Sequence, residues 1–254
     1  MSLNKRLFPS SAAAGATYHS SLIMNLDPND SASYSGTGPT ITDISGSGIS
    51  YNGTLSGGSF VSGSPSYFSM GSTNRITTAL DLTESSGYTI SVFVWDSAGT
   101  AATVANRKQV GGTSSADGNG GILMMGGDIT GGVSGESLYL YQYDTGGDPK
   151  FFLSYTTAFG IGGLNDSNWH SIQLSVSSSS QLLVVDGSSA TWVDSGTLDL
   201  ANLRFGGASN DSDSYTPNTI DRIGAMRVYS QALTVSEMQA EHNIDCATYG
   251  LATV

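Results

Sequence analysis

The C-terminal part of the chain contains one strand whose pattern limits the fold more than any other feature. On this strand Ile223, Ala225 and Tyr229 are expected on one face, and Met226 and Val228 on the other. Both faces are therefore partly apolar, which is typical of a strand that other layers cover on both sides.

A short helix is predicted directly after this strand, in a chain that otherwise shows almost no helical periodicity. Thr234 stands three residues before Glu237, which is the spacing of a capping box. Leu233 and Met238 occupy the positions of a hydrophobic staple. The sequence thus predicts where the helix starts. It also predicts the apolar contact that sets the angle at which the chain enters the helix.

The composition favours a strand-rich, loop-rich globule. A chain of 254 residues can form one domain with a substantial core. Ser and Gly make up roughly 30% of the residues, but apolar β-formers recur in short runs between them, unlike in disordered chains. Cys246 is the only cysteine, so no intrachain disulfide can form.

The charge balance argues against two classes of partner. The net charge is −12, from 9 basic and 21 acidic residues. Such a field repels nucleic acid and anionic membrane surfaces. The sequence has no apolar run long enough to span a membrane. We therefore expect neither nucleic acid nor a membrane as a partner.

Several motifs near the start follow one another in a characteristic order. A Leu-Asp strand at 22–27 precedes Ser-Tyr-x-Gly-x-Gly at 33–38, Asp-x-Ser-Gly-x-Gly at 43–48 and Asn-Gly-Thr-Leu at 52–55. This order resembles the opening of bacterial and phage laminin G-like domains. Glycine at these spacings permits the positive-φ turns that wrap a sheet edge.

The resemblance continues through the rest of the chain. Residues 88–95 alternate in the manner of the family's central strand, with Tyr88, Ile90, Val92 and Val94 on one face and Phe93 and Trp95 on the other. A Trp-His pair opens a hairpin at 169–187 that ends in Asp-Gly, as is typical of the superfamily. Further strands are expected at 67–70, 121–125, 137–143 and 151–155.

The resemblance implies an all-β fold: a two-sheet antiparallel jelly-roll sandwich of the concanavalin A-like type. One short C-terminal helix and an extended N-terminal arm complete it. The arm would comprise residues 1–20 and the laminin G-like jelly-roll domain residues 21–254. This fold hosts lectins, toxins, hydrolases and structural proteins, so it does not settle the function.

No catalytic residue is predicted. Glycosidases of the jelly-roll superfamily need two acidic residues that flank a glycosidic bond. The only close pair of glutamates here is Glu237 and Glu241, which we assign to the cap and the surface of the helix. His170 shares a strand face with Ile172 and Leu174, and we interpret it as a hydrogen-bonded sheet histidine rather than a catalytic or metal-binding one.

Calcium is the one cofactor for which the sequence offers candidate ligands. Asp211 and Asp213, and likewise Asp117 and Asn119, place oxygen ligands two residues apart in loops. Neither segment supplies the remaining ligands, and turn chemistry alone produces such pairs. The turn interpretation is therefore favoured over calcium at both places.

Three tyrosines define a candidate binding strand. Tyr139, Tyr141 and Tyr143 alternate along one expected strand, where they would line one face. An aromatic face of this kind can stack on sugar rings. Packing in the core or against a neighbouring subunit is the favoured alternative.

The preferred function is that of a non-enzymatic structural protein of a tailed-phage virion, a decoration or fibre-type subunit. Lys5 and Arg6 would meet acidic groups of another virion protein, while Leu7 and Phe8 would fill an apolar pocket. A homo-oligomer such as a trimer is expected. The alternative is a carbohydrate-binding module, on the virion or secreted, that attaches to a surface glycan. A glycoside hydrolase ranks third, because no acid pair is found.

Overall fold

The computed structural model describes residues 17–71, 74–97, 108–112, 121–126, 137–143, 149–154, 166–192, 200, 202–206 and 218–254. For residues 84, 108–112, 121–126, 137–143, 149–154, 190–192 and 218–219 it describes the backbone only.

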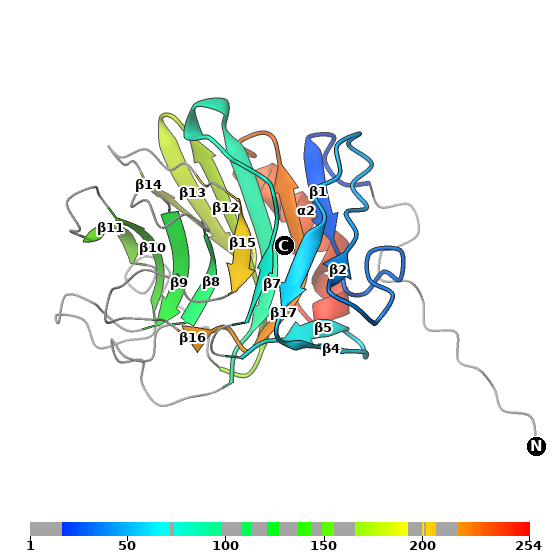
Figure 1. Cartoon of the computed structure of the whole chain (residues 1–254). Helices are drawn as coiled ribbons and strands as arrows, with labels where there is room; N and C mark the ends of the chain where they lie inside the picture. The colour runs from blue at the N-terminus through cyan, green and yellow to red at the C-terminus, as the bar shows by residue number, and fades with distance from the viewer. Residues whose placement is uncertain are drawn as a thin grey trace, which may run out of the picture.

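The described strands form two sheets (Figure 1). The first sheet has the order β14-β13-β12-β7-β17-β5-β4, with β1 also paired to β17. Its strands are β1 (Leu22–Leu26), β4 (Ser59–Val61), β5 (Tyr67–Ser69), β7 (Tyr88–Trp95), β12 (Trp169–Ser177), β13 (Ser180–Val185), β14 (Ser188–Trp192) and β17 (Arg222–Tyr229).

The second sheet has the order β11-β10-β9-β8-β15-β6-β3-β2, with β16 paired to β8. Its strands are β2 (Thr40–Ile41), β3 (Gly53–Ser56), β6 (Arg75–Thr77), β8 (Lys108–Gly112), β9 (Gly121–Gly126), β10 (Ser137–Tyr143), β11 (Pro149–Ser154), β15 (Arg204–Gly206) and β16 (Asn218–Thr219). The described pairs are antiparallel except for the parallel pair of β16 with β8.

One buried apolar cluster holds the two sheets together. Met24 and Val92 of the first sheet belong to the same cluster as Ile41, Ile76 and Phe205 of the second. Because each strand alternates, the apolar set of each sheet faces the other sheet. The predicted two-sheet antiparallel jelly-roll sandwich is therefore confirmed.

The face assignment on β17 was partly wrong. Ile223 lies in the inter-sheet core together with Met226 and Val228, not with Ala225 and Tyr229. The pairing of β17 with β7 shifts register between Ile223 and Met226. An extra residue in one strand reverses the alternation beyond it, so simple period-2 counting placed Ile223 on the wrong face.

The glycines of the N-terminal motifs adopt the expected turns. Gly36, Gly38, Gly46 and Gly48 have φ values of 92°, 85°, 72° and 88°. These values lie in the left-handed region, where a side chain is disfavoured. The prediction of positive-φ turns is confirmed.

The helix α2 (Val235–Asp245) begins as predicted. The Thr234 side chain accepts a hydrogen bond from the Glu237 backbone, and the Glu237 side chain accepts one from the Thr234 backbone. Leu233 and Met238 share one buried cluster, so the predicted staple contact is present. The 3₁₀ helix η3 (Cys246–Tyr249) follows α2 directly, and a second one, η1 (Glu84–Ser86), precedes β7.

The helix α2 packs on the outer face of the first sheet, the face turned away from the second sheet. Figure 1 shows α2 beside β1 and β17. Two polar side chains of β12 bond to the helix: Ser171 to the His242 ring at 2.7 Å, and Gln173 to the Met238 carbonyl, to which it donates. A third, Ser175, donates to the Leu233 carbonyl, just before the helix begins. The helix is thus attached by hydrogen bonds as well as by apolar contacts.

Glu241 was wrongly expected on the helix surface. Its carboxylate is buried and accepts hydrogen bonds from the Tyr229 hydroxyl, at 2.6 Å, and from the His19 backbone. Because α2 lies flat on the sheet, the side of the helix that carries Glu241 faces β17.

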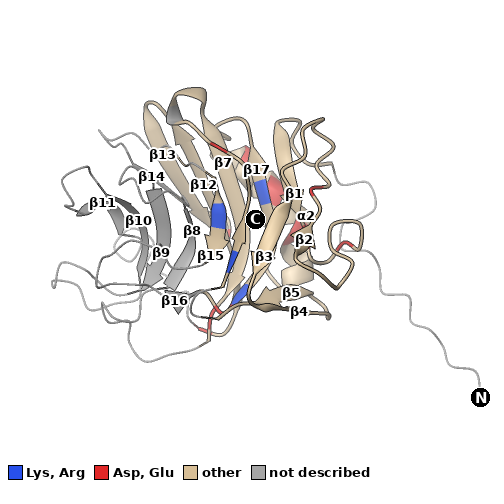
Figure 2. Ribbon diagram, in the orientation of Figure 1, with Lys and Arg blue, Asp and Glu red and all other residues tan. Residues whose placement is uncertain are grey.

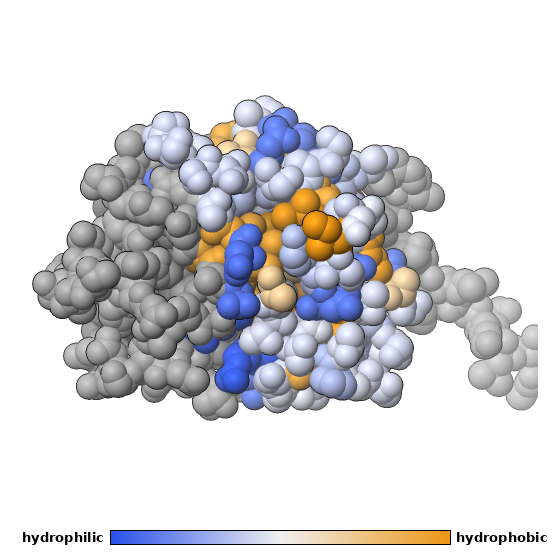
Figure 3. Space-filling model, turned by 45° about the horizontal axis from the view of Figure 1, so that its top comes forward, coloured by the Kyte–Doolittle hydropathy of each residue, from blue (hydrophilic) through white to orange (hydrophobic). Residues whose placement is uncertain are grey.

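The described surface is mostly neutral and polar. In Figure 3 most described atoms are pale or blue, with orange atoms gathered in the middle of the face. Among the described residues, Ile49 and Val254 are the exposed large apolar side chains. No helix within the described residues is both long and apolar enough to cross a membrane.

Candidate functional site

Four large side chains gather on the outer face of the first sheet. They are Tyr67 of β5, Trp95 of β7, Trp169 of β12 and Arg222 of β17, and we call them the aromatic–arginine cluster. Trp169 is paired with Trp95, and Trp95 with Arg222, so these three positions form one row across three strands. All four residues are half-buried, so each exposes part of its surface to solvent.

The contacts within the cluster fix the rings in place. The Arg222 guanidinium carbon lies 3.6 Å from the centroid of the Trp95 ring and 4.8 Å from that of Tyr67. Tyr67 and Trp169 meet edge to face, with their centroids 5.9 Å apart. The Trp95 indole donates to the Ser167 carbonyl at 2.8 Å. The cluster is therefore a rigid array of rings around one cation.

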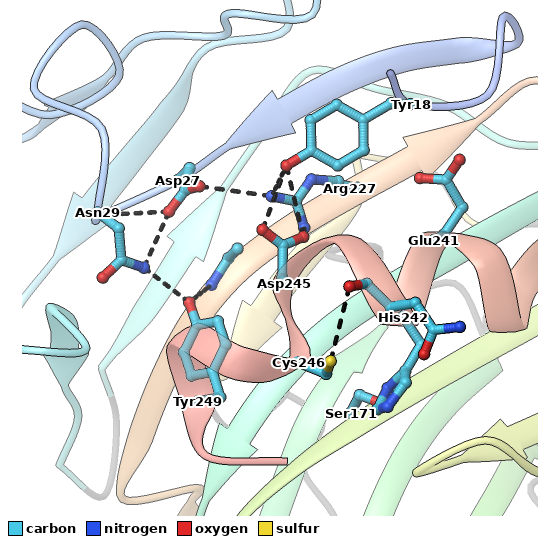
Figure 4. A network of polar contacts seen from close by, with 12 residues as sticks. Tyr18, Asp27, Asn29, Ser171, Arg227, Glu241, His242, Asp245, Cys246 and Tyr249 are labelled. Carbon is cyan, nitrogen blue, oxygen red and sulfur yellow. Dashed lines mark hydrogen bonds and ion pairs between the residues drawn. The ribbon is translucent and has the colours of Figure 1, made fainter. Parts of the chain in front are cut away.

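A buried polar network, drawn in Figure 4, lies on the same outer face of the first sheet as the cluster. Its centre is Arg227 of β17, whose guanidinium lies 2.7 Å from the Asp245 carboxylate and 3.4 Å from that of Asp27. The guanidinium also donates to the Tyr18 hydroxyl at 2.8 Å, and its carbon lies 4.4 Å from the centroid of the Tyr18 ring. The network thus joins the residue that follows β1, strand β17, the end of α2 and the segment before β1.

The charges of this network stabilise one another. Burial alone would lower the pKa of Arg227, but the neighbouring Asp245 carboxylate raises it above its usual value. Burial raises the pKa of Asp245, and the charge of Arg227 opposes this shift. A buried cation between two carboxylates is held in one place, because any displacement would leave a charge unpaired.

Tyr249 connects the buried network with the cluster. Its ring stacks on Phe93 with the centroids 4.1 Å apart, and it meets Trp169 at 4.9 Å. Its hydroxyl accepts hydrogen bonds from the Ala225 backbone at 2.7 Å and from the Asn29 amide at 2.9 Å. Tyr249 is fully enclosed and supports the inner edge of Trp169.

Asn29 completes the connection on the other side. Its amide donates to Tyr249, and its side-chain oxygen accepts from the Ser66 backbone at 2.7 Å, directly before Tyr67. Its backbone donates to the Asp27 carboxylate at 2.8 Å. Asn29 therefore ties the buried network to both aromatic ends of the cluster.

His170 lies between two carboxylates next to Trp169. Its Nδ1 is 2.7 Å from Asp186, and its Nε2 is 3.1 Å from Asp166. The predicted hydrogen-bonded sheet histidine is confirmed. Burial alone would lower the pKa of His170, but the bonds and charges of Asp186 and Asp166 outweigh it, and the pKa lies above its usual value.

This arrangement predicts a pH-dependent contribution of His170 to stability. Because the folded-state pKa is raised, the contribution is complete below the unfolded pKa and is lost as pH rises through the folded value. The difference in Tm between wild type and His170→Gln should therefore shrink as pH rises from about 5.5 to about 8.5. A difference that is constant over this range would contradict the ion pairs.

The other candidate sites lie outside the residues or side chains that the structure describes. The candidate calcium ligands Asp117, Asn119, Asp211 and Asp213 and the arm residues Lys5, Arg6, Leu7 and Phe8 lie outside the described residues. Tyr139, Tyr141 and Tyr143 all fall on β10, between β9 and β11, but only their backbone is described. These candidates stay predictions. Within the described ranges, no group of three or more His, Cys, Asp or Glu side chains is arranged to hold a metal ion.

The chain resembles several solved structures. A botulinum neurotoxin type G receptor-binding domain matches with a TM-score of 0.61 and 15% identity, over 91% of this chain and 54% of that one. A serotype D ligand-binding domain in complex with N-acetylneuraminic acid matches with a TM-score of 0.62 and 12% identity, again over 91% and 54%. The chain thus spans about half the length of these toxin domains.

A third structure matches over nearly its whole length. Domain 4 of AbnA, an extracellular GH43 arabinanase from Geobacillus stearothermophilus, was solved in complex with arabinotriose. It has a TM-score of 0.56 and 17% identity, over 85% of this chain and 95% of that domain. The likeness shows the fold. No protein-family model and no curated protein matches the chain.

Proposed function

We propose that this chain is a non-enzymatic glycan-binding domain and that sugar rings stack on its aromatic–arginine cluster. The observation that carries the proposal is the cluster itself: two tryptophans and a tyrosine, half-exposed, from separate strands and held by a rigid base. The apolar C–H face of a sugar packs well on an aromatic ring. Preorganised rings bind it without a large entropic cost of ordering.

The comparisons support a binding role of this kind. The structures named above are a receptor-binding domain and two domains solved with sugars. The AbnA domain carries the most weight, because the match covers 95% of it. The toxin domains carry less, because half of their length has no counterpart here.

The placement of the glutamates in the helix favours binding over hydrolysis. Glu237 caps α2, and Glu241 is buried against Tyr229. The one close glutamate pair of the sequence is therefore used to hold the helix. A retaining or inverting glycosidase needs two carboxyls that face a bound sugar.

The test is a glycan array with wild type and Trp169→Ala. We expect reproducible binding to at least one oligosaccharide, reduced by about tenfold or more in the variant, since tryptophan anchors dominate binding energies. Ile49→Ala, which trims the most exposed large apolar side chain in the described part, is the matched control and should bind normally. Equal binding by wild type and Trp169→Ala would refute the site.

Tyr141→Ala tests the competing location on β10. If binding disappears in that variant and persists in Trp169→Ala, the sugar binds along the tyrosine strand instead.

The expected virion role stays a prediction, and none of the structures named above is a virion protein by its description. A deletion that tests the arm should end before Tyr18, which contacts the buried Arg227.

A further inference from the structure

Two arginines lie on the same face of β17, in different electrostatic surroundings. Arg222 and Arg227 each have an aromatic ring against the guanidinium. Arg227 is neutralised by two carboxylates, those of Asp27 and Asp245. For Arg222, in contrast, the described residues provide the rings of Trp95 and Tyr67, and neither a hydrogen bond nor an ion pair joins its guanidinium to any of them.

The lack of an acidic partner for Arg222 within the described part of the chain is notable, because the sequence has 21 acidic and only 9 basic residues. Figure 2 shows how few described positions carry Lys or Arg. Asp221, the neighbour of Arg222, accepts hydrogen bonds from Ser97 at 2.6 Å and 3.1 Å. Among the described residues, no ion pair joins this or any other carboxylate to the Arg222 guanidinium, whose contacts there are with the two rings.

The geometry leaves the guanidinium able to bind an anion. The guanidinium carbon lies over the rings of Trp95 and Tyr67, 3.6 Å and 4.8 Å from their centroids. The N–H donors of a guanidinium lie in its plane and point away from stacked rings. Because the residue is half-buried, a ligand reaching these donors would meet a partly desolvated cation, where a two-pronged bond to a carboxylate is strong.

We infer that the glycan bound here carries a carboxylate, as uronic and sialic acids do, and that Arg222 pairs with it. This inference rests on the proposed function. The sugar ring packs on Trp169 and Tyr67 while its carboxylate meets the edge of Arg222. The pair fixes the orientation of the sugar and selects an acidic residue over its neutral counterpart.

The net charge limits the ligand to one or a few acidic residues. At −12, the chain repels long polyanions at low ionic strength. A single carboxylate that contacts a guanidinium gains a short-range, charge-assisted bond that outweighs this repulsion. We therefore expect short or sparsely charged acidic glycans to bind better than densely charged ones.

The experiment compares acidic sugars with neutral forms of the same sugars. One arm uses digalacturonate and its methyl ester, and the other uses a sialyllactose and the methyl ester of the same sialyllactose. Binding is measured by calorimetry on the full chain. In at least one arm the acidic form should bind about tenfold or more tightly than the neutral form. The arm that shows the preference separates uronic from sialic acids.

Variants then assign the preference to Arg222. Arg222→Gln should abolish the difference in affinity between the acidic and neutral forms. Arg222→Lys should retain part of this difference, since a lysine keeps the charge but cannot form two parallel hydrogen bonds to a carboxylate. Arg75→Gln is the matched control. Arg75 on β6 is also half-buried and without an ion pair to a described residue, but no described aromatic ring stacks on it. It should preserve the preference.

Different experimental outcomes would contradict the proposed glycan binding and the role of Arg222. If neutral and acidic forms bind equally and Trp169→Ala abolishes both, the proposed function stands and the inference is wrong. The inference is also wrong if Arg222→Gln keeps the preference. If no glycan of either kind binds a folded protein, both proposals fall.

Discussion

Replacing Arg227 by methionine should lower the free energy of unfolding by about 3–5 kcal/mol, because removing one partner of a buried ion pair leaves a charge uncompensated. Arg227 and Asp245 are 2% and 1% exposed, so water cannot replace the lost partner. Asp27 also loses its cation, and Tyr18 loses the guanidinium under its ring. Urea denaturation followed by tryptophan fluorescence measures the change.

Two further variants identify the cause. Arg75→Met removes the same charge from a half-buried position without a described ion pair, and it should cost less than about 1 kcal/mol. Adding Asp27→Asn and Asp245→Asn to Arg227→Met should recover part of the loss, since the unpaired carboxylates are then neutral. If the triple variant is less stable than Arg227→Met alone, the loss comes from packing and not from charge.

The sequence was sufficient to predict the framework of the fold. The strands at 88–95 and 169–176 were found because their apolar residues alternate cleanly, and β7 and β12 lie there. The start of α2 was found because capping chemistry is local, between Thr234 and Glu237. Patterns of this kind depend on residues that are close in the sequence, so they can be recognised without knowing the fold.

Features that depend on pairing between distant strands could not be predicted. The bulge on β17 places Ile223 in the core. Gly224 is a local sign of a bulge, but a glycine in a strand can equally mark a close backbone approach, so it does not by itself show where the pairing shifts. The burial of Glu241 follows from the way α2 lies on the sheet. Both outcomes are set by neighbours that only the folded chain brings together.

The candidate site was missed for the same reason. Trp95 ends one predicted strand and Trp169 begins another, and both were visible in the sequence. Their convergence with Arg222 requires that β12, β7 and β17 be adjacent and in register. The sequence instead indicates the tyrosines of β10, because their alternation is local to one strand.

The contact between Tyr249 and Gly224 predicts two large and coupled losses of stability. Tyr249→Ala removes a buried ring that stacks on Phe93, and it should cost about 3–5 kcal/mol. A Cβ at Gly224 would lie 2.5 Å from the Tyr249 ring and hydroxyl, so Gly224→Ala should cost about 1–3 kcal/mol by overpacking. In the Tyr249→Ala background this clash is absent. The double variant should therefore be as stable as Tyr249→Ala or more stable, which gives a coupling energy of about 1–3 kcal/mol.

Tyr249→Phe is the control for this cycle. It keeps the stacked ring and removes the hydroxyl that accepts from Ala225 and Asn29, so it should cost about 1–3 kcal/mol for the buried groups left unpaired. Gly224→Ala should remain destabilising in that background, since the ring still fills the space above Gly224. Additive losses in the alanine cycle, measured by the same denaturation, would show that the glycine is not required by the ring. Coupled losses would establish that Gly224 makes room for the residue that supports Trp169.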